Sequence, residues 1–320
     1  MSNPIRATSS GQLAHRRTWM RRAVTGLALA GAALWLAPGH VHASPAPTVV
    51  EAVQLPAWVE RHGQRRPAQP GAVLRTSDKA LTAAGARMLL RLPDRSVVKL
   101  GESTELVIQA MELSRQSVAG PQSIKSDLRL VTGVFRYATD VASKLAGNQR
   151  QLNLQLATAT VGIRGTDFWS MTDAEHDAVC VFDGQVAVLR EQKPEIALNK
   201  PGAFWVVFTG QPEKPAGQAT PDQLAKFIDQ ADLKPGSGVL VRGGRWRAVL
   251  ALLPSAAQAA ELRTRLASAG YPAEVLAKEG RFEVRINQLA TEQDAKSVVA
   301  RLAAQPGLGV RNARVALAAN

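Results

Sequence analysis

Few side chains outside the N-terminal segment are of a type that carries catalytic or metal-binding chemistry. The candidates are His62, His176 and Cys180, with Asp173 and Glu175 in a polar stretch beside the second histidine. A nucleophile needs a base within reach, and zinc needs three or four ligands held together. The sequence contains no G-x-S-x-G, H-E-x-x-H or glycine-rich phosphate loop. We therefore expect a non-catalytic protein without a metal or cofactor, in which Cys180 is a buried thiol.

The first 43 residues have the pattern of an export signal. They hold five arginines and no acidic residue, followed by the uncharged run Ala23–Pro38 and the small-x-small exit Val41–Ala43. This run has 16 residues, whereas a membrane-spanning helix needs roughly 20. We predict cleavage before Ser44, with an uncleaved membrane anchor as the alternative. No cysteine follows the run, which excludes a lipoprotein.

Two interpretations of the export route stay open. The segment Arg16–Arg21 resembles a twin-arginine signal. Alternatively, Met20 is the true start, and it leaves a short ordinary signal peptide. Both place the remaining chain in the periplasm.

Export changes the meaning of the net charge, which is +13 with a pI near 10.5. Without residues 1–43 the net charge is +8, of which +6 lies in residues 238–320. A basic module outside the cytoplasm meets envelope polymers and lipid headgroups rather than chromosomes. We therefore expect no nucleic-acid partner.

Residues 49–208 have the sequence pattern of an all-β domain, which would be a sandwich or a roll. Two apolar runs flank a Pro-Asp turn at residues 88–100, and Leu152–Leu156 alternates as a half-buried strand does. Asp183-Gly184 between two apolar runs predicts a hairpin. Few stretches in this region have a helical period, and Gln109–Ser117 is the one candidate for a helix.

Residues 209–238 form a linker, in which Thr220-Pro221 predicts the start of a short helix. After the linker, the sequence pattern changes from all-β to α+β. Residues 239–320 then read as a β-α-β-β-α-β domain, with Ser255 and Thr291 as the two helix caps. The fold class is thus an all-β N-terminal domain followed by an α+β C-terminal domain.

The segment 157–189 resembles the FecR domain, in which an alternating strand ends in Arg-Gly-Thr and a Gly-x-Val turn follows. The resemblance covers roughly residues 49–208. The motif residues that we expect to be mainly structural are Arg164, Gly165, Thr166, Phe168, Asp183 and Gly184. Gly165 suits a bulge, and Arg164 lies beside Asp167, with which it would tie a strand end. The family's signalling role needs a cytoplasmic domain before the membrane helix, and at most 22 residues precede the apolar run.

Residues 239–320 resemble the SPOR domain, a peptidoglycan-binding module. The matching segments are Arg245-Trp246, residues 259–266, Gly270–Ala273, Phe282–Ile286, Ala295, Arg301-Leu302 and Val315. The family binds glycan strands stripped of their stem peptides through an exposed sheet face. The resemblance implies Trp246, Arg281 and Phe282 as candidate glycan-binding residues.

The chain departs from the SPOR pattern at three positions where the family has polar groups that face the sugar. These positions hold Val249, Leu252 and Glu283. Apolar replacements leave sugar hydroxyls unpaired, so we expect weaker or altered glycan binding, with a protein-binding surface as the alternative.

We thus predict a periplasmic cell-envelope protein whose β domain is a scaffold that binds an envelope protein. The SPOR-like domain would tether it to peptidoglycan at septa, in cell division, or wherever bare glycan occurs. Two alternatives remain, a membrane-anchored FecR-type signalling protein and a degenerate SPOR module that binds protein. The RNA-recognition topology is similar to that of the C-terminal domain, but its aromatic signature is absent.

Overall fold

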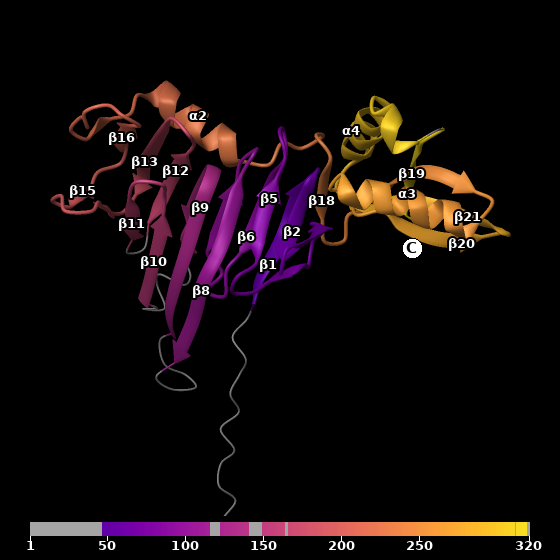
Figure 1. The fold of residues 1–320 in the computed structure, drawn as a ribbon, viewed down its shortest axis with the longest axis horizontal. Helices are drawn as coiled ribbons and strands as arrows, with labels where there is room; N and C mark the ends of the chain where they lie inside the picture. The colour runs from indigo at the N-terminus through magenta and orange to yellow at the C-terminus, as the bar shows by residue number, and fades with distance from the viewer. Residues whose placement is uncertain (1–46, 116–121, 141–148, 164–165, 311, 319–320) are drawn as a thin grey trace, which may run out of the picture. The chain divides into compact units, whose positions relative to one another are not determined.

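The computed structural model describes residues 47–115, 122–140, 149–163, 166–310 and 312–318. All of them fall within one compact unit, Ser44–Asn320. The unit joins a β domain to a C-terminal α+β domain, which confirms the fold class expected from the sequence (Figure 1).

The β domain consists of two sheets. The first sheet has the strand order β1-β6-β7-β9-β12-β13-β16-β17, with the short β4 beside β1. The second has the order β3-β2-β5-β8-β9-β10-β11-β14-β15. The strands of the first sheet are β1 (Thr48–Gln54), β4 (Val73–Leu74), β6 (Arg87–Arg91), β7 (Val97–Leu100), β9 (Gln122–Ala138), β12 (Asp167–Thr172), β13 (His176–Asp183), β16 (Ala203–Phe208) and β17 (Gly217–Gln218). Those of the second are β2 (Ala57–Arg61), β3 (Gln64–Pro67), β5 (Lys79–Thr82), β8 (Glu105–Arg115), β10 (Gln149–Gln155), β11 (Thr160–Ile163), β14 (Val186–Leu189) and β15 (Ile196–Leu198).

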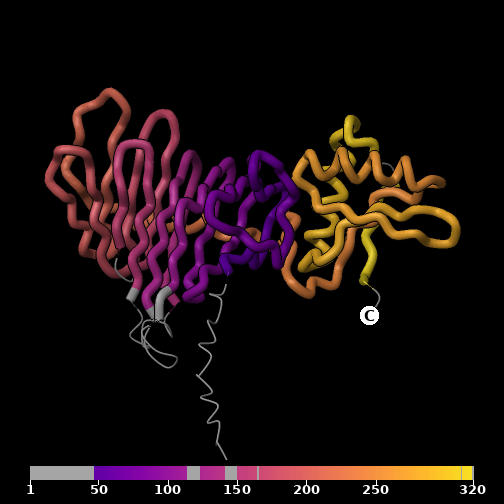
Figure 2. Tube along the Cα trace, turned by 60° about the horizontal axis from the view of Figure 1, so that its bottom comes forward, coloured from indigo at the N-terminus to yellow at the C-terminus, as the bar shows by residue number. Residues whose placement is uncertain are grey.

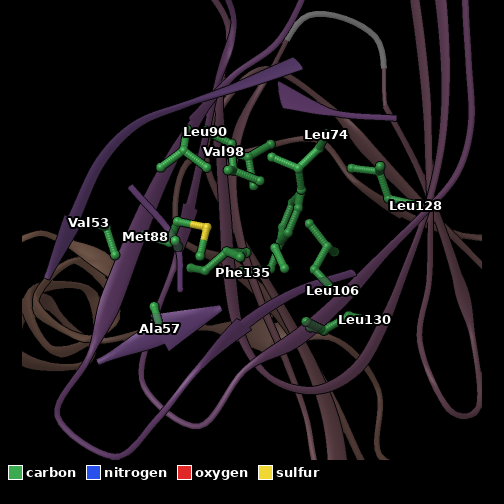
Figure 3. Packing of buried hydrophobic residues seen from close by; sticks show 14 of the residues in the cluster. Val53, Ala57, Leu74, Met88, Leu90, Val98, Leu106, Leu128, Leu130 and Phe135 are labelled. Carbon is green, nitrogen blue, oxygen red and sulfur yellow. The ribbon is translucent and has the colours of Figure 1, made fainter. Parts of the chain in front are cut away.

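The long strand β9 belongs to both sheets and joins them. Its first part pairs with β8 and β10, and its last part pairs with β7 and β12. The inner faces of the two sheets share one hydrophobic core, in which Met88 and Phe135 of the first sheet meet Leu106 and Leu128 of the second (Figure 3). Burial of this apolar surface is the main stabilising contribution to the sandwich.

The structure corrects the hairpin predicted at Asp183-Gly184. Strand β13 pairs with β12 and β16, whereas β14 pairs with β11 and β15. The turn therefore carries the chain from one sheet to the other. The reason lies in burial: residues 177–181 of β13 are buried in succession, as in an interior strand covered on both faces, whereas β14 alternates between buried and more exposed positions.

The helix that the sequence pattern allowed at Gln109–Ser117 is also wrong. Residues up to Arg115 belong to the strand β8, which pairs with β9 along most of its length. A register shift between Ile108 and Ala110 displaces the alternation by one residue, and this explains why the sequence pattern was ambiguous.

The linker contains the predicted helix, α2 (Pro221–Ala231). Thr220 is its N-cap, and Gln223 completes a capping box. The helix covers the outer surface of the first sheet, where Phe227 stacks on Trp169 with ring centroids 4.0 Å apart and lies near Phe204 (Figure 1).

The C-terminal domain has the predicted β-α-β-β-α-β order. It begins with β18 (Val239–Val241), which pairs with β1, and continues with β19 (Trp246–Leu253), α3 (Ala256–Ser268), β20 (Glu274–Lys278), β21 (Arg281–Leu289), α4 (Glu292–Ala303), the 3-10 turn η1 (Pro306–Leu308) and β22 (Arg314–Leu317). Its antiparallel sheet has the order β22-β19-β21-β20. Ser255 and Thr291 cap α3 and α4 as expected. Figure 2 follows this segment in orange to yellow.

Candidate functional site

One face of the C-terminal sheet is covered by helices, and the other is not. The buried sides of α3 and α4 pack in one cluster with Ala248, Leu250, Val284 and Ile286 of the central strands. Because strand side chains alternate, the intervening residues point to the opposite side of the sheet. We call that side the open face. The residues on it include Arg247, Val249, Leu252, Glu274, Leu276, Glu283, Arg285 and Arg314, with Asn287, whose Nδ2 donates a hydrogen bond of 2.6 Å to Glu274.

The strand register arranges four of these side chains in a first row across the sheet. Arg314 is opposite Val249, Val249 is opposite Arg285, and Arg285 is opposite Glu274. Neighbouring strands lie about 4.8 Å apart, so the two arginines lie roughly 10 Å apart at the backbone, with Val249 between them. In this row the side chain of Arg314 is exposed, that of Arg285 is mostly buried and Val249 is buried.

A second row has an apolar side chain on each side of a carboxylate. Leu252 and Leu276 are both opposite Glu283, and they are 40% and 42% exposed. Exposed leucines on both sides of a polar centre offer apolar contact to a ligand that also carries polar groups.

Glu283 itself is buried, with its side chain only 4% exposed. Its carboxylate lies 3.5 Å from Arg285 Nη1 and 3.9 Å from Arg314 Nη2. These are long ion pairs, in which neither arginine makes the close two-pronged contact that its fork allows. The carboxylate thus lies close to both guanidinium groups, at the limit of hydrogen-bonding distance from Arg285.

Two arginine donors on this face are buried and have no acceptor in the described part of the chain. They are the Nε–H groups of Arg247 and Arg285. A buried donor without an acceptor costs free energy, and such groups in native structures call for a ligand or solvent partner. The face as a whole carries three arginines, Arg247, Arg285 and Arg314, and two carboxylates, Glu274 and Glu283, so its excess of positive charge is small.

The structure separates the three residues that the sequence proposed for glycan binding. Trp246 and Phe282 are partly buried and pack against the hydrophobic cluster on the helix side of the sheet. Arg281 is exposed, and its Nη2 donates a hydrogen bond of 3.0 Å to the Leu252 carbonyl oxygen at the rim of the open face. Of the three, only Arg281 borders the open face.

Sequence reasoning missed Arg247, Arg285 and Arg314. A signal for Arg285 was present, since the alternation in Phe282–Ile286 puts Phe282 with Val284 and Ile286, and Arg285 on the other side. Arg314 lies in the short strand β22, and its place on the open face is evident only from its pairing with Val249 of β19.

The FecR-like motif residues that are described have structural positions. Thr166 is fully buried, and its carbonyl oxygen accepts hydrogen bonds from the backbone and side chain of Thr139. Phe168 packs between Phe135 and Tyr137 in the core, with ring centroids 5.7 and 6.1 Å away. Gly184 has a φ of 84°, a left-handed conformation that glycine adopts without strain.

The remaining motif residues are Arg164, Gly165 and Asp183. Arg164 and Gly165 lie outside the described residues, and Asp183 ends β13. Asp167, for which Arg164 was the expected partner, accepts hydrogen bonds of 3.0 and 2.8 Å from Arg136. The strand end is thus tied by an arginine on β9.

The side chains that could have carried catalysis are held in turns and in the core. Asp173 accepts backbone hydrogen bonds of 2.8 Å from Glu175 and His176, as in a tight turn. Cys180 is fully buried, and this burial raises the pKa of its thiol to about 12. A thiol with so high a pKa is unreactive at neutral pH. Within the described residues, no three His, Cys, Asp or Glu side chains gather as they would around a metal ion.

Comparison with known proteins identifies two modules. A family model described as FecR protein matches residues 78–187, and a model described as SPOR domain matches residues 242–311. No curated protein matches the chain. Two solved structures, each of a candidate anti-sigma factor from Parabacteroides distasonis, align with 64% and 76% of this chain and 96% and 98% of their own. Their identities are 14% and 16%, each with a TM-score of 0.36.

Proposed function

Because this chain contains a FecR domain and a SPOR domain, we propose that it is a non-catalytic protein of the periplasm that the SPOR domain tethers to peptidoglycan. The glycan strands would lie on the open face. The FecR domain would act as a scaffold that holds an envelope protein partner.

The observation that supports this proposal best is the open face itself. Both helices of the domain lie on one side of its sheet, and the other side presents the exposed side chains of Leu252, Leu276 and Arg314. An extended polymer fits a flat sheet face better than it fits an enclosed pocket. The net charge of +6 in residues 238–320 favours a ligand that carries negative charge.

The proposed location is supported by the export pattern of the N-terminal 43 residues. In the described part of the chain, no helix is long and apolar enough to cross a bilayer. A scaffold role for the β domain agrees with the positions of its histidine, cysteine and carboxylate groups in turns and core.

Sedimentation with purified cell-wall sacculi tests the proposal. We expect residues 44–320 to sediment with sacculi from which an amidase has removed the stem peptides, and to bind intact sacculi far less. Arg285→Gln should weaken this binding, whereas Arg263→Gln, an equal loss of charge on the exposed side of α3, should leave it unchanged. Failure to sediment with either kind of sacculi would contradict peptidoglycan binding and leave protein binding as the function of the open face.

A further inference from the structure

The strand β20 forms a free edge of the C-terminal sheet. Within the described residues it pairs only with β21, and four of its five residues are exposed. A free edge presents unpaired backbone donors and acceptors, to which another strand can be added, and natural proteins block such edges with prolines, bulges and charged side chains. β20 has neither a proline nor a register shift, and its only charged residues are Glu274 and Lys278. Whether the edge can pair therefore depends on these two charges.

The turn after β20 determines which of its backbone groups are free. Two residues, Glu279 and Gly280, join β20 to β21, and both have positive φ values, 50° and 76°. These values match a type I′ turn, which is closed by a hydrogen-bonded pair of flanking residues. Because hydrogen-bonded and non-hydrogen-bonded pairs alternate in an antiparallel ladder, every second residue of β20, counted back from Lys278, bonds to β21. The N–H and C=O groups of the residues between them, Val275 and Ala277, therefore point to the free edge.

The charges of β20 are complementary to those of a second, antiparallel copy of the same strand. Two copies that pair around Leu276 bring Glu274 of each copy opposite Lys278 of the other. Cross-strand pairs of opposite charge stabilise a sheet, whereas like charges directly opposite each other destabilise it. In the same register Val275 of one copy lies opposite Ala277 of the other, so the free backbone groups of the two edges meet.

The middle of this edge is apolar. Leu276 lies at the two-fold axis of the paired arrangement, and it is 42% exposed. Opposite its own copy it has a non-hydrogen-bonded position, at which the side chains of two strands lie closest. Contact between the two leucines removes apolar surface from water. Backbone pairing, opposite charges and apolar contact thus all favour one register.

The other free edge of the sheet lacks this complementarity. Strand β22 also pairs with a single strand, β19, in the part of the chain that the structure describes. Antiparallel pairing of β22 with its own copy would put Arg314 opposite Leu317, with no acidic residue facing the arginine. Self-complementarity is therefore a property of the sequence of β20 and does not follow from its position at an edge.

We infer that β20 is an interface between two copies of this chain, at which their C-terminal sheets join edge to edge. The two-fold axis of an antiparallel pair is perpendicular to the sheet, so both open faces lie on the same side of the joined sheet. The row of Leu252, Glu283 and Leu276 then continues into the same row of the second copy. The inference does not depend on what the open face binds.

Charge reversal tests this register. Glu274→Lys places two positive charges opposite each other at both ends of the interface, and Lys278→Glu places two negative charges there. We expect analytical ultracentrifugation to show that unsubstituted residues 44–320 form dimers between low and high micromolar concentration. Each variant alone should have a dissociation constant at least about tenfold higher. An equimolar mixture of the two variants should regain the affinity, because each altered strand then faces opposite charges.

The matched control is Lys296→Glu, the same change of charge on α4, where the side chain is 57% exposed. It should leave the association unchanged, and a thermal melt of each variant checks that its fold is intact. Leu276→Cys gives a second measurement. With copper phenanthroline as oxidant, it should form a disulfide between two copies, because a cysteine at the two-fold axis faces its own counterpart. Leu252→Cys, 40% exposed but on the inner strand β19, should not.

Three results would overturn the inference. They are a monomer at every concentration up to high micromolar, single variants that associate as tightly as the unsubstituted chain, and a mixture of variants that does not regain the affinity. The last two would assign any dimer to another surface. None of them bears on glycan binding, which sedimentation with sacculi tests separately.

Discussion

Replacement of Arg150 by alanine is expected to lower the free energy of unfolding of the β domain by about 3–5 kcal/mol. The Nε of Arg150 on β10 donates a hydrogen bond of 2.6 Å to Asp94 Oδ2, and the two side chains are only 4% and 2% exposed. Asp94 also accepts hydrogen bonds from the backbone and hydroxyl of Ser96 in the turn between β6 and β7. Loss of the arginine would leave a buried carboxylate without its cation, which costs far more than an exposed pair.

The midpoint of urea unfolding, followed by tryptophan fluorescence, measures this effect. Arg65→Ala is the matched control, since Arg65 pairs with Glu60 but its side chain is 55% exposed, and we expect a change below about 1 kcal/mol. The double variant Arg150→Met, Asp94→Asn removes both charges and should regain most of the stability. A loss for Arg150→Ala no larger than for Arg65→Ala would show that the buried pair contributes little.

Asp294→Ala should have a comparable effect in the SPOR domain, with a loss of about 3 kcal/mol or more. Asp294 is fully buried near the start of α4. Its Oδ1 accepts hydrogen bonds of 3.0 and 2.9 Å from the backbone of Gly238 and Val239, and its Oδ2 accepts two from the backbone and hydroxyl of Thr291. One carboxylate thus satisfies the helix cap and fixes the entry of the chain into β18, and alanine would leave these donors unpaired.

Hydrogen exchange read by mass spectrometry locates this loss. Amides of α4 and β18 should exchange on the order of a hundredfold faster in Asp294→Ala, as about 3 kcal/mol predicts. Glu292→Gln, in the same first turn but 49% exposed, should change exchange little. Unchanged protection of α4 and β18 in Asp294→Ala would contradict the role assigned to this carboxylate.

The parts of the fold that the sequence predicted well are those with local signals. The helices α2, α3 and α4 begin next to Thr220, Ser255 and Thr291, because a capping side chain satisfies backbone donors whatever the tertiary context. The hairpin of β6 and β7 likewise follows from a turn that closes on itself.

The parts that it predicted poorly depend on pairing between distant strands. Asp183-Gly184 has the chemistry of a hairpin turn, yet the strands on each side find partners in different sheets. Helix α2, which covers β13, lies about 45 residues later in the chain, so no short stretch of sequence contains both elements. Burial on the second face of the sheet decided this arrangement.

The candidate site stays a prediction, and the sequence indicated a face of the sheet rather than the side chains that lie on it. Resemblance to the SPOR domain indicated the sheet face, and the substitutions Val249, Leu252 and Glu283 indicated that its chemistry is altered. Aromatic side chains drew attention to Trp246 and Phe282, which lie on the helix side. The pairing of Arg285 and Arg314 across Val249 depends on register between β19, β21 and β22, and it emerges only in three dimensions.

The most direct test of glycan binding by the open face is a map of amide chemical shifts of residues 44–320 during titration with strands freed of stem peptides. We expect the shifts to concentrate at Val249, Leu252, Glu283, Arg285 and Arg314, while α3, α4 and the β domain stay unchanged. Shifts that concentrate on the helices or on the FecR domain, or no shift at saturating glycan, would contradict this expectation.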